Sequence, residues 1–421
     1  MLFNRIWIGF FGIAFIVGTY YLIFEQDLDI YKRMMDALFD SAKSAFEISI
    51  GLTGALCFWL GFMRIGEKGG AVTLISKLIA PLFVRVFPDI PRNHPAVGSI
   101  MMNFSANMLG LDNAATPLGL KAMKEMQELN PEKETASNAQ IMFLALNTAG
   151  LTIIPVSVLA LRSKFGSANT TEVFLPILIT TFLSALFALI IVAIKQRIRL
   201  IDPVVLAYFL GGLGFVSSLL ICSWYFPQYM ETISNIMGNG ILFGIIILFL
   251  VLAARKKVVV YDEFIEGAKE GFQVAITIVP YVVAILCAIG LFRSSGALDL
   301  LLRGFIELFK VIGMVHTEFV QALPVGLIKP FSGSGGRAML QSIIEANTTE
   351  TVKGVDTFVA KIAATMQGGT ETTFYILAVY FGSVKIKNTR YAAGVGLIVD
   401  LIGIIIAILV SYMFYQVPPV K

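Results

Sequence analysis

The sequence predicts an all-α, polytopic membrane protein built from two related halves. Of its 421 residues, 57% are hydrophobic and only 14% are charged, whereas soluble domains carry about 25% charged residues. Residues 36–83 also align without a gap with residues 262–309, at a constant offset of 226 positions. Transporters are often built from two such repeats, which enclose a binding site between them.

The repeat includes charged as well as apolar identities. Asp36 aligns with Asp262, and Lys43 aligns with Lys269. Further identities continue to the end of the aligned segments: Ala42/Ala268, Phe46/Phe272, Ile50/Ile276, Leu60/Leu286, Gly70/Gly296, Ala71/Ala297, Leu74/Leu300, Leu82/Leu308 and Phe83/Phe309. This part of the chain is expected to form a common frame for the two halves.

Apolar stretches of about 20 residues, the length that crosses the hydrocarbon core, recur along the chain. The first is expected to be retained as a span, because no small-residue cleavage pattern follows it and Glu25 and Asp27 come directly after. The predicted spans are 5–24, 47–65, 139–161, 173–194, 203–225, 233–254, 273–292, 357–382 and 391–415.

Two kinds of helix outside these spans are predicted. Segments 71–87 and 297–312 are apolar but short and interrupted by charges, which is typical of interfacial or re-entrant helices. Segments 28–46 and 259–272 carry charges on one helical face and predict amphipathic helices on the membrane surface. The alternative is that 28–46 and 259–272 extend the spans that follow them.

The chain divides into an N-terminal span, two repeats and a connecting hairpin. Basic residues at 195–199 and 255–257 close two spans, so the positive-inside rule places them in the cytoplasm. An inverted arrangement of the repeats is favoured, mostly by analogy with transporters. The expected units are a span at 1–27, a repeat at 28–200, a transmembrane hairpin at 201–257 and a second repeat at 258–421.

The segment 94–121 has the length of a span but contains polar residues. Gly110 and Pro117 predict a break in the helix. Irregular backbone at membrane depth is tolerated only where it is buried in protein or faces a water-filled cavity. We therefore predict that this segment contributes to a binding site with Asn103, Asn107, Asp112, Asn113 and Thr116.

The second half contains its own interruption, Pro330-Phe-Ser-Gly-Ser-Gly-Gly-Arg337. Free backbone amides in such a loop, at the start of a helix and beside an arginine, predict a cradle for an anion or carboxylate. Ser332, Ser334 and Arg337 are its candidate ligands. The alternative is that the glycines only allow close helix packing.

Two predicted spans carry matching polar residues at their centres. Asn147-Thr-Ala-Gly-Leu-Thr152 aligns with Gln367-Gly-Gly-Thr-Glu-Thr372 at an offset of 220. Amides and hydroxyls at midspan suit a polar solute, and Na⁺ or H⁺ are the candidate coupling ions. The Glu371 carboxylate is expected either to carry a proton or cation, or to pair with Arg337 and hold the fold together. The candidate residues here are Asn147, Thr148, Gln367, Thr370 and Glu371.

Other classes of function find no support in the sequence. The net charge of +4 is spread thinly over the chain, which excludes a nucleic-acid surface. His94, His316 and the three cysteines lack partners at metal-ligand spacing. No nucleophile and base occur together, so we expect neither an enzyme, nor a resident cofactor, nor a bound metal.

The quoted residues also carry a family resemblance. Gly110-Leu-Asp-Asn-Ala-Ala-Thr-Pro-Leu-Gly119 closely resembles the spore maturation A proteins, and Lys329-Pro-Phe-Ser-Gly-Ser-Gly-Gly-Arg337 resembles the spore maturation B proteins. The chain is similar to a fusion of the two, over roughly residues 36–195 and 250–412. Both groups contain the nucleoside recognition or gate domain, a label that describes a domain rather than a substrate.

The resemblance implies two gate-type repeats in a bacterial cytoplasmic membrane. Together with the polar segments, it predicts a transporter that moves a small polar solute, nucleoside-like or an organic anion, through a site between the repeats. A homo-oligomer in the lipid bilayer is also expected. The alternative is a non-transporting scaffold or accessory protein in envelope or spore maturation.

Overall fold

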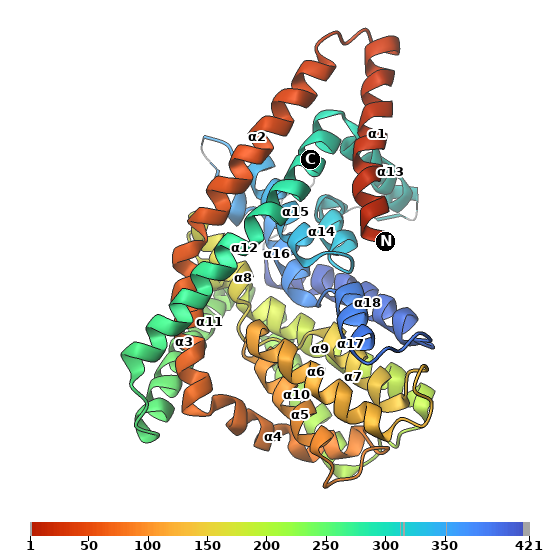
Figure 1. The fold of residues 1–421 in the computed structure, drawn as a ribbon. Helices are drawn as coiled ribbons and strands as arrows, with labels where there is room; N and C mark the ends of the chain where they lie inside the picture. Colours follow the sequence, from red (N-terminus) through yellow and green to blue (C-terminus); the bar gives the residue numbers. More distant parts are fainter. Residues whose placement is uncertain (1, 312, 315, 351, 416–421) are drawn as a thin grey trace.

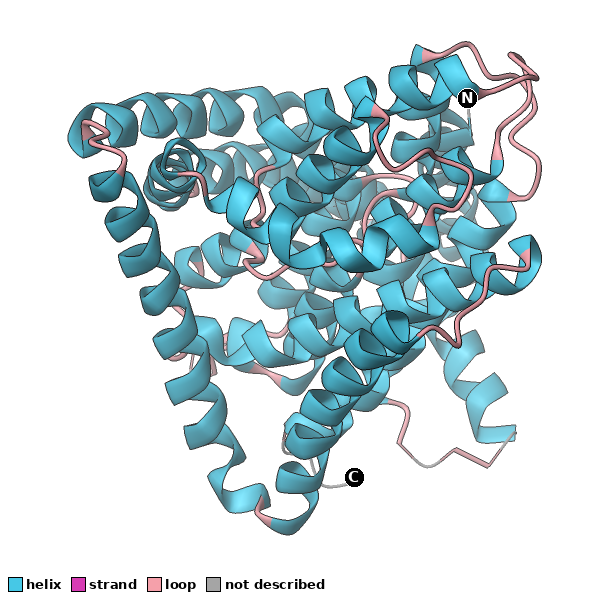
Figure 2. Ribbon diagram, turned by 90° about the horizontal axis from the view of Figure 1, so that it is seen from below, coloured by secondary structure: helices cyan, strands magenta, loops and turns pink. Residues whose placement is uncertain are grey.

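The protein folds almost entirely into α-helices joined by short connections (Figure 2). The computed structural model describes residues 2–311, 313–314, 316–350 and 352–415, and this part of the chain contains no β-strand. Figure 1 shows a long slanting arm, formed by α2, α3 and α12, beside a compact bundle that holds α5–α7, α9, α10 and α16–α18. The expected all-α architecture is confirmed.

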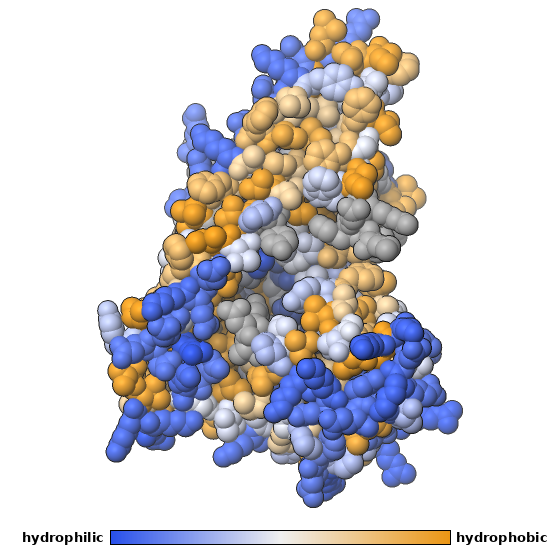
Figure 3. All heavy atoms as spheres, viewed as in Figure 1, coloured by the Kyte–Doolittle hydropathy of each residue, from blue (hydrophilic) through white to orange (hydrophobic). Residues whose placement is uncertain are grey.

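Five helices of the described chain are long and apolar enough to cross a membrane, and two bent helix pairs also pass this test. Figure 3 shows hydrophilic residues gathered over the lower part of one face, mostly hydrophobic residues above them, and further hydrophilic residues at the upper end. Both observations identify a multi-pass membrane protein. The five helices are α1 (Leu2–Phe24), α9 (Phe174–Gln196), α10 (Pro203–Tyr225), α11 (Pro227–Arg255) and α18 (Ala392–Phe414).

Glycines at equivalent positions turn the chain in both repeats. Gly70 has a φ of 92° and Gly296 a φ of 81°, a backbone conformation that glycine adopts without a steric penalty. At Gly70 the chain turns by 66°, as expected for a helix that does not continue the span. The helices on either side of these turns are α3 (Thr53–Gly69), α4 (Ala71–Val86), α12 (Val260–Ser294) and α13 (Ala297–Val311).

The two amphipathic segments continue toward the spans that follow them. Segment 259–272 forms the start of α12, a 35-residue helix that is bent by 40° near Pro280. Segment 28–46 forms most of α2 (Ile30–Gly51), which is separated from α3 by Leu52 alone. The structure therefore favours the alternative expectation, in which these segments extend their spans. The packing of α12 against α2 and α3 accompanies this change. Gly267 and Gly271 of α12 lie against the backbone of α3, whereas Phe39, Phe46 and Phe272 remain exposed.

Equivalent helices of the two repeats run antiparallel. The Cys287 thiol lies 3.6 Å from the carbonyl oxygen of Leu38, and Gly61 lies against the ring of Phe264. With the offset of 226, Leu38 is equivalent to Phe264 and Gly61 to Cys287, so each contact is the symmetry mate of the other. An approximate two-fold axis therefore relates α2–α3 to α12, which is the geometry of an inverted repeat.

Two predicted spans are interrupted at their centres. The predicted span 139–161 breaks at Gly150, where φ is 59°. The predicted span 357–382 breaks at Thr370, whose backbone is extended. Pro155 then lacks the N–H that a continuous helix needs, and Gly368 and Gly369 weaken the second helix. The prediction of one unbroken span in each place was wrong. The four shorter helices are α7 (Asn138–Ala149), α8 (Val156–Lys164), α16 (Phe358–Gly369) and α17 (Thr373–Ser383).

Two helical hairpins complete the bundle. The tip of each hairpin is tied to an interrupted helix of its own half: Ile153 N donates to Met108 O at 2.7 Å, and Phe374 N donates to Pro330 O at 3.0 Å. This brings four irregular segments to the middle of the bundle. The hairpin helices are α5 (Pro95–Met108), α6 (Asp112–Leu129), α14 (Leu323–Ile328, preceded by a 3₁₀ turn at Glu318–Ala322) and α15 (Gly333–Ala346).

A buried ionic cluster joins the loops that precede α9 and α16. Arg162 is 0% exposed, and its guanidinium donates to Val355 O at 2.9 Å and to Asp356 Oδ1 at 3.2 Å. It also donates to Ser167 Oγ at 2.8 Å, and Glu172 lies 3.6 Å away. Because a buried charge needs paired and hydrogen-bonded partners, this cluster fixes the first half of the chain against the second.

Candidate functional site

A cavity of about 1000 Å³ lies between the slanting arm and the bundle. Apolar side chains of α1, α3 and α12, including Trp7, Leu56 and Val274, form one wall. The opposite side is polar and consists of the four irregular segments described above. A mostly apolar cavity with a few converging polar groups is the usual form of a small-molecule site.

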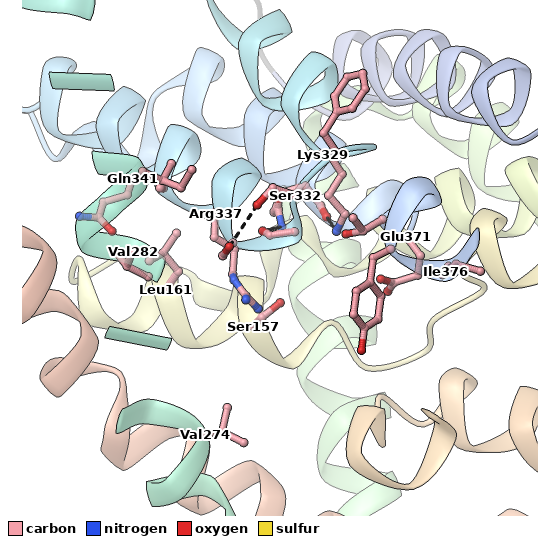
Figure 4. A pocket seen from close by; sticks show the side chains of 18 of the residues that line it. Ser157, Leu161, Val274, Val282, Lys329, Ser332, Arg337, Gln341, Glu371 and Ile376 are labelled. Carbon is pink, nitrogen blue, oxygen red and sulfur yellow. Dashed lines mark hydrogen bonds between the residues drawn. The ribbon is translucent and has the colours of Figure 1, made fainter. Parts of the chain in front are cut away.

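The cavity brings together side chains that are distant in the sequence. Figure 4 shows Ser332 and Arg337 at the start of α15, with the Arg337 side chain directed toward Ser157 of α8. Glu371 and Lys329 lie on the other side of Ser332 in the same view. Eight of the predicted site residues line this cavity: Asn107, Thr116, Asn147, Ser332, Ser334, Arg337, Gln367 and Glu371.

Amide side chains form the centre of the polar surface. Asn107 Nδ2 donates to Asn147 Oδ1 at 2.8 Å, and Asn147 Nδ2 donates to Phe143 O at 2.8 Å. Gln367 Oε1 is buried and accepts no hydrogen bond from any described residue. Since a buried carbonyl oxygen without a donor is unfavourable, this atom is suited to accept a hydrogen bond from a bound solute.

Helix ends and charged side chains determine the electrostatics of the site. Ser332 caps α15 by accepting a hydrogen bond from Gly335 N at 2.9 Å, so the positive N-terminal end of α15 and Arg337 face the same space. Lys329 Nζ donates to Gln367 O at 2.8 Å, near the carboxyl end of α16. Glu371 N donates to Thr148 O at 2.8 Å and thereby joins the two helix breaks. The site thus offers both cationic and anionic groups.

Three predicted residues are buried behind the cavity. Asn103 Nδ2 donates to Ala115 O at 2.8 Å and holds α5 against α6, so Asn103 stabilises the hairpin. Thr148 is buried and contributes its carbonyl oxygen to the contact with Glu371. Thr370 faces Asp400 of α18. The side chains of Asp112 and Asn113 lie outside the described residues.

Sequence reasoning missed several residues of this region. Lys329 is only 7% exposed, and its position directly before the Pro330–Arg337 loop was the available signal. Phe331, Tyr375 and Tyr380 line the cavity, but aromatic residues are too frequent in this chain to stand out. Asp400 was identifiable as a lone carboxylate inside an apolar span. Among the described residues, no group of three or more His, Cys, Asp or Glu side chains could hold a metal ion.

Comparison with known proteins gives consistent matches. The family model "Gate: Nucleoside recognition" matches residues 49–200 and 275–387. Spore maturation protein A of Bacillus subtilis is 40% identical over 188 residues, which is 45% of this chain and 92% of that protein. Spore maturation protein B of the same organism is 40% identical over 166 residues, 39% of this chain and 88% of that protein. No solved structure matches the chain.

Proposed function

Because the chain belongs to the gate, or nucleoside recognition, family, we propose that it moves a small polar solute through the cavity between its two repeats. The observation that carries this proposal is the convergence of both hairpin tips and both helix breaks on one cavity. Helices interrupted at membrane depth place backbone dipoles and polar side chains around transported solutes. A purely structural bundle would have no need to leave this polar surface beside an open volume.

The chemistry of the cavity suits a solute with a flat or apolar body and an anionic or strongly polar end. Arg337, the Ser332 cap and the α15 N-terminus favour an anionic group. Gln367 offers an acceptor for an N–H or O–H group of the solute. Tyr375 and Phe331 provide aromatic surface on the same cavity. Nucleoside-like molecules and small organic anions both satisfy this description.

We further propose that the protein acts in the bacterial cytoplasmic membrane and is not an enzyme. The cavity residues bind and orient a solute, and none of them forms a nucleophile–base pair. A homo-oligomer stays a prediction. The second candidate function is a scaffold in envelope or spore maturation, which the names of the two relatives favour.

Solute binding to the purified protein tests the proposal. Thermal unfolding is followed with a panel of nucleosides and small carboxylates, and hits are tested for uptake into proteoliposomes. Arg337→Gln and Glu371→Gln are expected to reduce affinity or uptake at least tenfold. Arg92→Gln and Glu350→Gln, which change exposed residues outside the cavity, are matched controls and should behave like the parent protein.

Complementation of a deletion strain separates the two candidate functions. A transporter should lose complementing activity in Arg337→Gln and Glu371→Gln, whereas a scaffold should retain it as long as the variants reach the membrane. Retained complementation, together with no stabilisation by any solute of the panel, would exclude the transport proposal.

A further inference from the structure

A second polar site lies behind the cavity, around Asp400 of α18. Asp400 is 3% exposed, and it does not line the cavity. Thr373 Oγ1 donates to its Oδ2 atom at 2.6 Å. The other carboxylate oxygen, Oδ1, is buried and accepts no well-formed hydrogen bond from any described residue. A buried carboxylate oxygen without a partner is costly, so its surroundings indicate an occupant.

Further oxygen atoms surround the same region. Gly403 is one helical turn from Asp400, and a methyl group at Gly403 would lie 3.2 Å from Ser184 Oγ and 3.8 Å from the carbonyl oxygen of Gly369. Ser184 is 0% exposed, and its hydroxyl has no partner among the described residues. The Thr370 side chain faces the Asp400 carboxylate. The same methyl position lies 2.5 Å from Thr370 Cγ2. Ser184 of α9 and the Gly369 carbonyl of the α16–α17 break therefore approach α18 at Gly403, one helical turn from the Asp400 carboxylate.

The electrostatics of this space favour a cation. Lys329 and Glu371 act electrostatically on Asp400, and the Lys329 ammonium donates to Gln367 O at 2.8 Å. The Gly369 carbonyl also lies at the carboxyl end of α16, the negative end of the helix dipole. Hydroxyl, carbonyl and carboxylate oxygens are ligands of hard cations. A single direct carboxylate suits a monovalent ion better than Ca²⁺, which usually has several.

We propose that Asp400, Ser184, Thr370 and the Gly369 carbonyl bind one sodium ion. This inference rests on the proposed function in one respect, because the ion is assigned the role of coupling ion for the solute. The α16–α17 break carries the ion ligands Gly369 and Thr370 on one side and the cavity residue Glu371 next to them. Sodium binding therefore fixes the backbone that also positions the solute site.

Sodium binding is measured without any solute, so that its outcome does not depend on transport. The melting temperature of the purified protein is followed as NaCl replaces choline chloride or KCl at constant ionic strength, and bound ²²Na⁺ is counted. The parent protein should be stabilised by Na⁺ and bind one ion. Asp400→Asn and Ser184→Ala should lower the apparent Na⁺ affinity at least tenfold. Ser411→Ala is the matched control. Ser411 is equally buried and its hydroxyl also has no partner within the described part of the chain, but it lies about three turns beyond Asp400 along α18.

Several results would overturn the sodium site. These are equal stabilisation by K⁺ and choline, an unchanged Na⁺ affinity in both variants, or a response to pH alone. If Asp400→Asn does not fold, Ser184→Ala and Thr370→Val decide the question, with circular dichroism as the folding check. Sodium binding without solute uptake would refute the proposed function but support the ion site. Solute uptake without sodium binding would refute the ion site but support the proposed function.

Discussion

Removal of the Arg162 side chain should destabilise the protein strongly, because Arg162 connects the two halves. The Arg162 side chain is 1% exposed, whereas those of Glu172 and Asp356 are 12% and 25% exposed. Breaking a buried ion pair on one side costs about 3–5 kcal/mol. Glu172 keeps its ion pair with Lys361 at 2.5 Å, and Asp356 is partly hydrated. We therefore expect Arg162→Met to cost about 3 kcal/mol, at the lower end of that range.

Thermal unfolding of the purified variants measures this loss. At roughly 2 °C per kcal/mol for a large chain, the melting temperature should fall by about 6 °C. Lys353→Met is the matched control, because Lys353 Nζ donates to Gly166 O at 2.7 Å in the same pair of loops but is exposed. Its cost should stay below about 1 kcal/mol.

A double variant tests the physical reason for the loss. Arg162→Met leaves the Asp356 carboxylate without its guanidinium partner, so adding Asp356→Asn should recover part of the lost melting temperature. If Arg162→Met melts within 1–2 °C (about 1 kcal/mol) of Lys353→Met, the cluster does not fasten the two halves and the reasoning is refuted.

Three further outcomes are expected. Gly403→Ala places a methyl group 2.5 Å from Thr370 Cγ2 and should lower the free energy of unfolding by about 1–3 kcal/mol. Gly394→Ala on the same helix meets nothing within 4 Å and should be neutral or stabilising. A lower melting temperature for Gly394→Ala would contradict this. Leu38→Cys should be cross-linked to Cys287 by a short thiol reagent. Parallel repeats would instead bring residues 38 and 264 together, so Leu38→Cys combined with Phe264→Cys in a Cys287→Ala background should not be cross-linked. Burial raises the pKa of Asp202. Hydrogen bonds from Val204 N and Val205 N, together with the charge of Arg85, lower it by more than burial raises it, so the pKa of Asp202 lies below 3.8. Its contribution to stability should therefore be present above the unfolded pKa of about 3.8 and be lost as the pH falls through the folded pKa, so the parent protein and Asp202→Asn should differ in melting temperature near neutral pH and converge in strong acid.

Much of the fold was predictable because membrane spans depend on apolar length, a local property. The helix breaks were harder to place: the polar residues around Asn147 and Gln367 were visible, but continuity of a helix depends on whether Gly150 or Thr370 has a partner to replace the lost hydrogen bonds. The replacing partners come from distant segments: Thr148 O accepts from Glu371 N of the other half, whereas Met108 O and Pro330 O accept from Ile153 N and Phe374 N within the same half.

Polarity predicted which residues belong to the buried centre, but not what each of them contacts. Asn107 and Asn103 lie one turn apart in α5, yet Asn107 lines the cavity while Asn103 binds Ala115 O. The sequence offers only one signal for Asp400, a lone carboxylate within an apolar span. Only the packing of α18 against α9 shows that Ser184 lies against Gly403, one helical turn from Asp400.

The two-fold relation between the arm helices also bears on how the protein changes shape. The first repeat is interrupted at Leu52, whereas its counterpart α12 stays continuous and bends by 40° near Pro280. We expect that an exchange of these two shapes between the repeats produces a second conformation, in which the cavity between the arm and the bundle is rearranged. The energy difference between the two conformations then comes from side chains that differ at equivalent positions, such as Leu38 and Phe264, and from parts without a counterpart, such as the hairpin α10–α11.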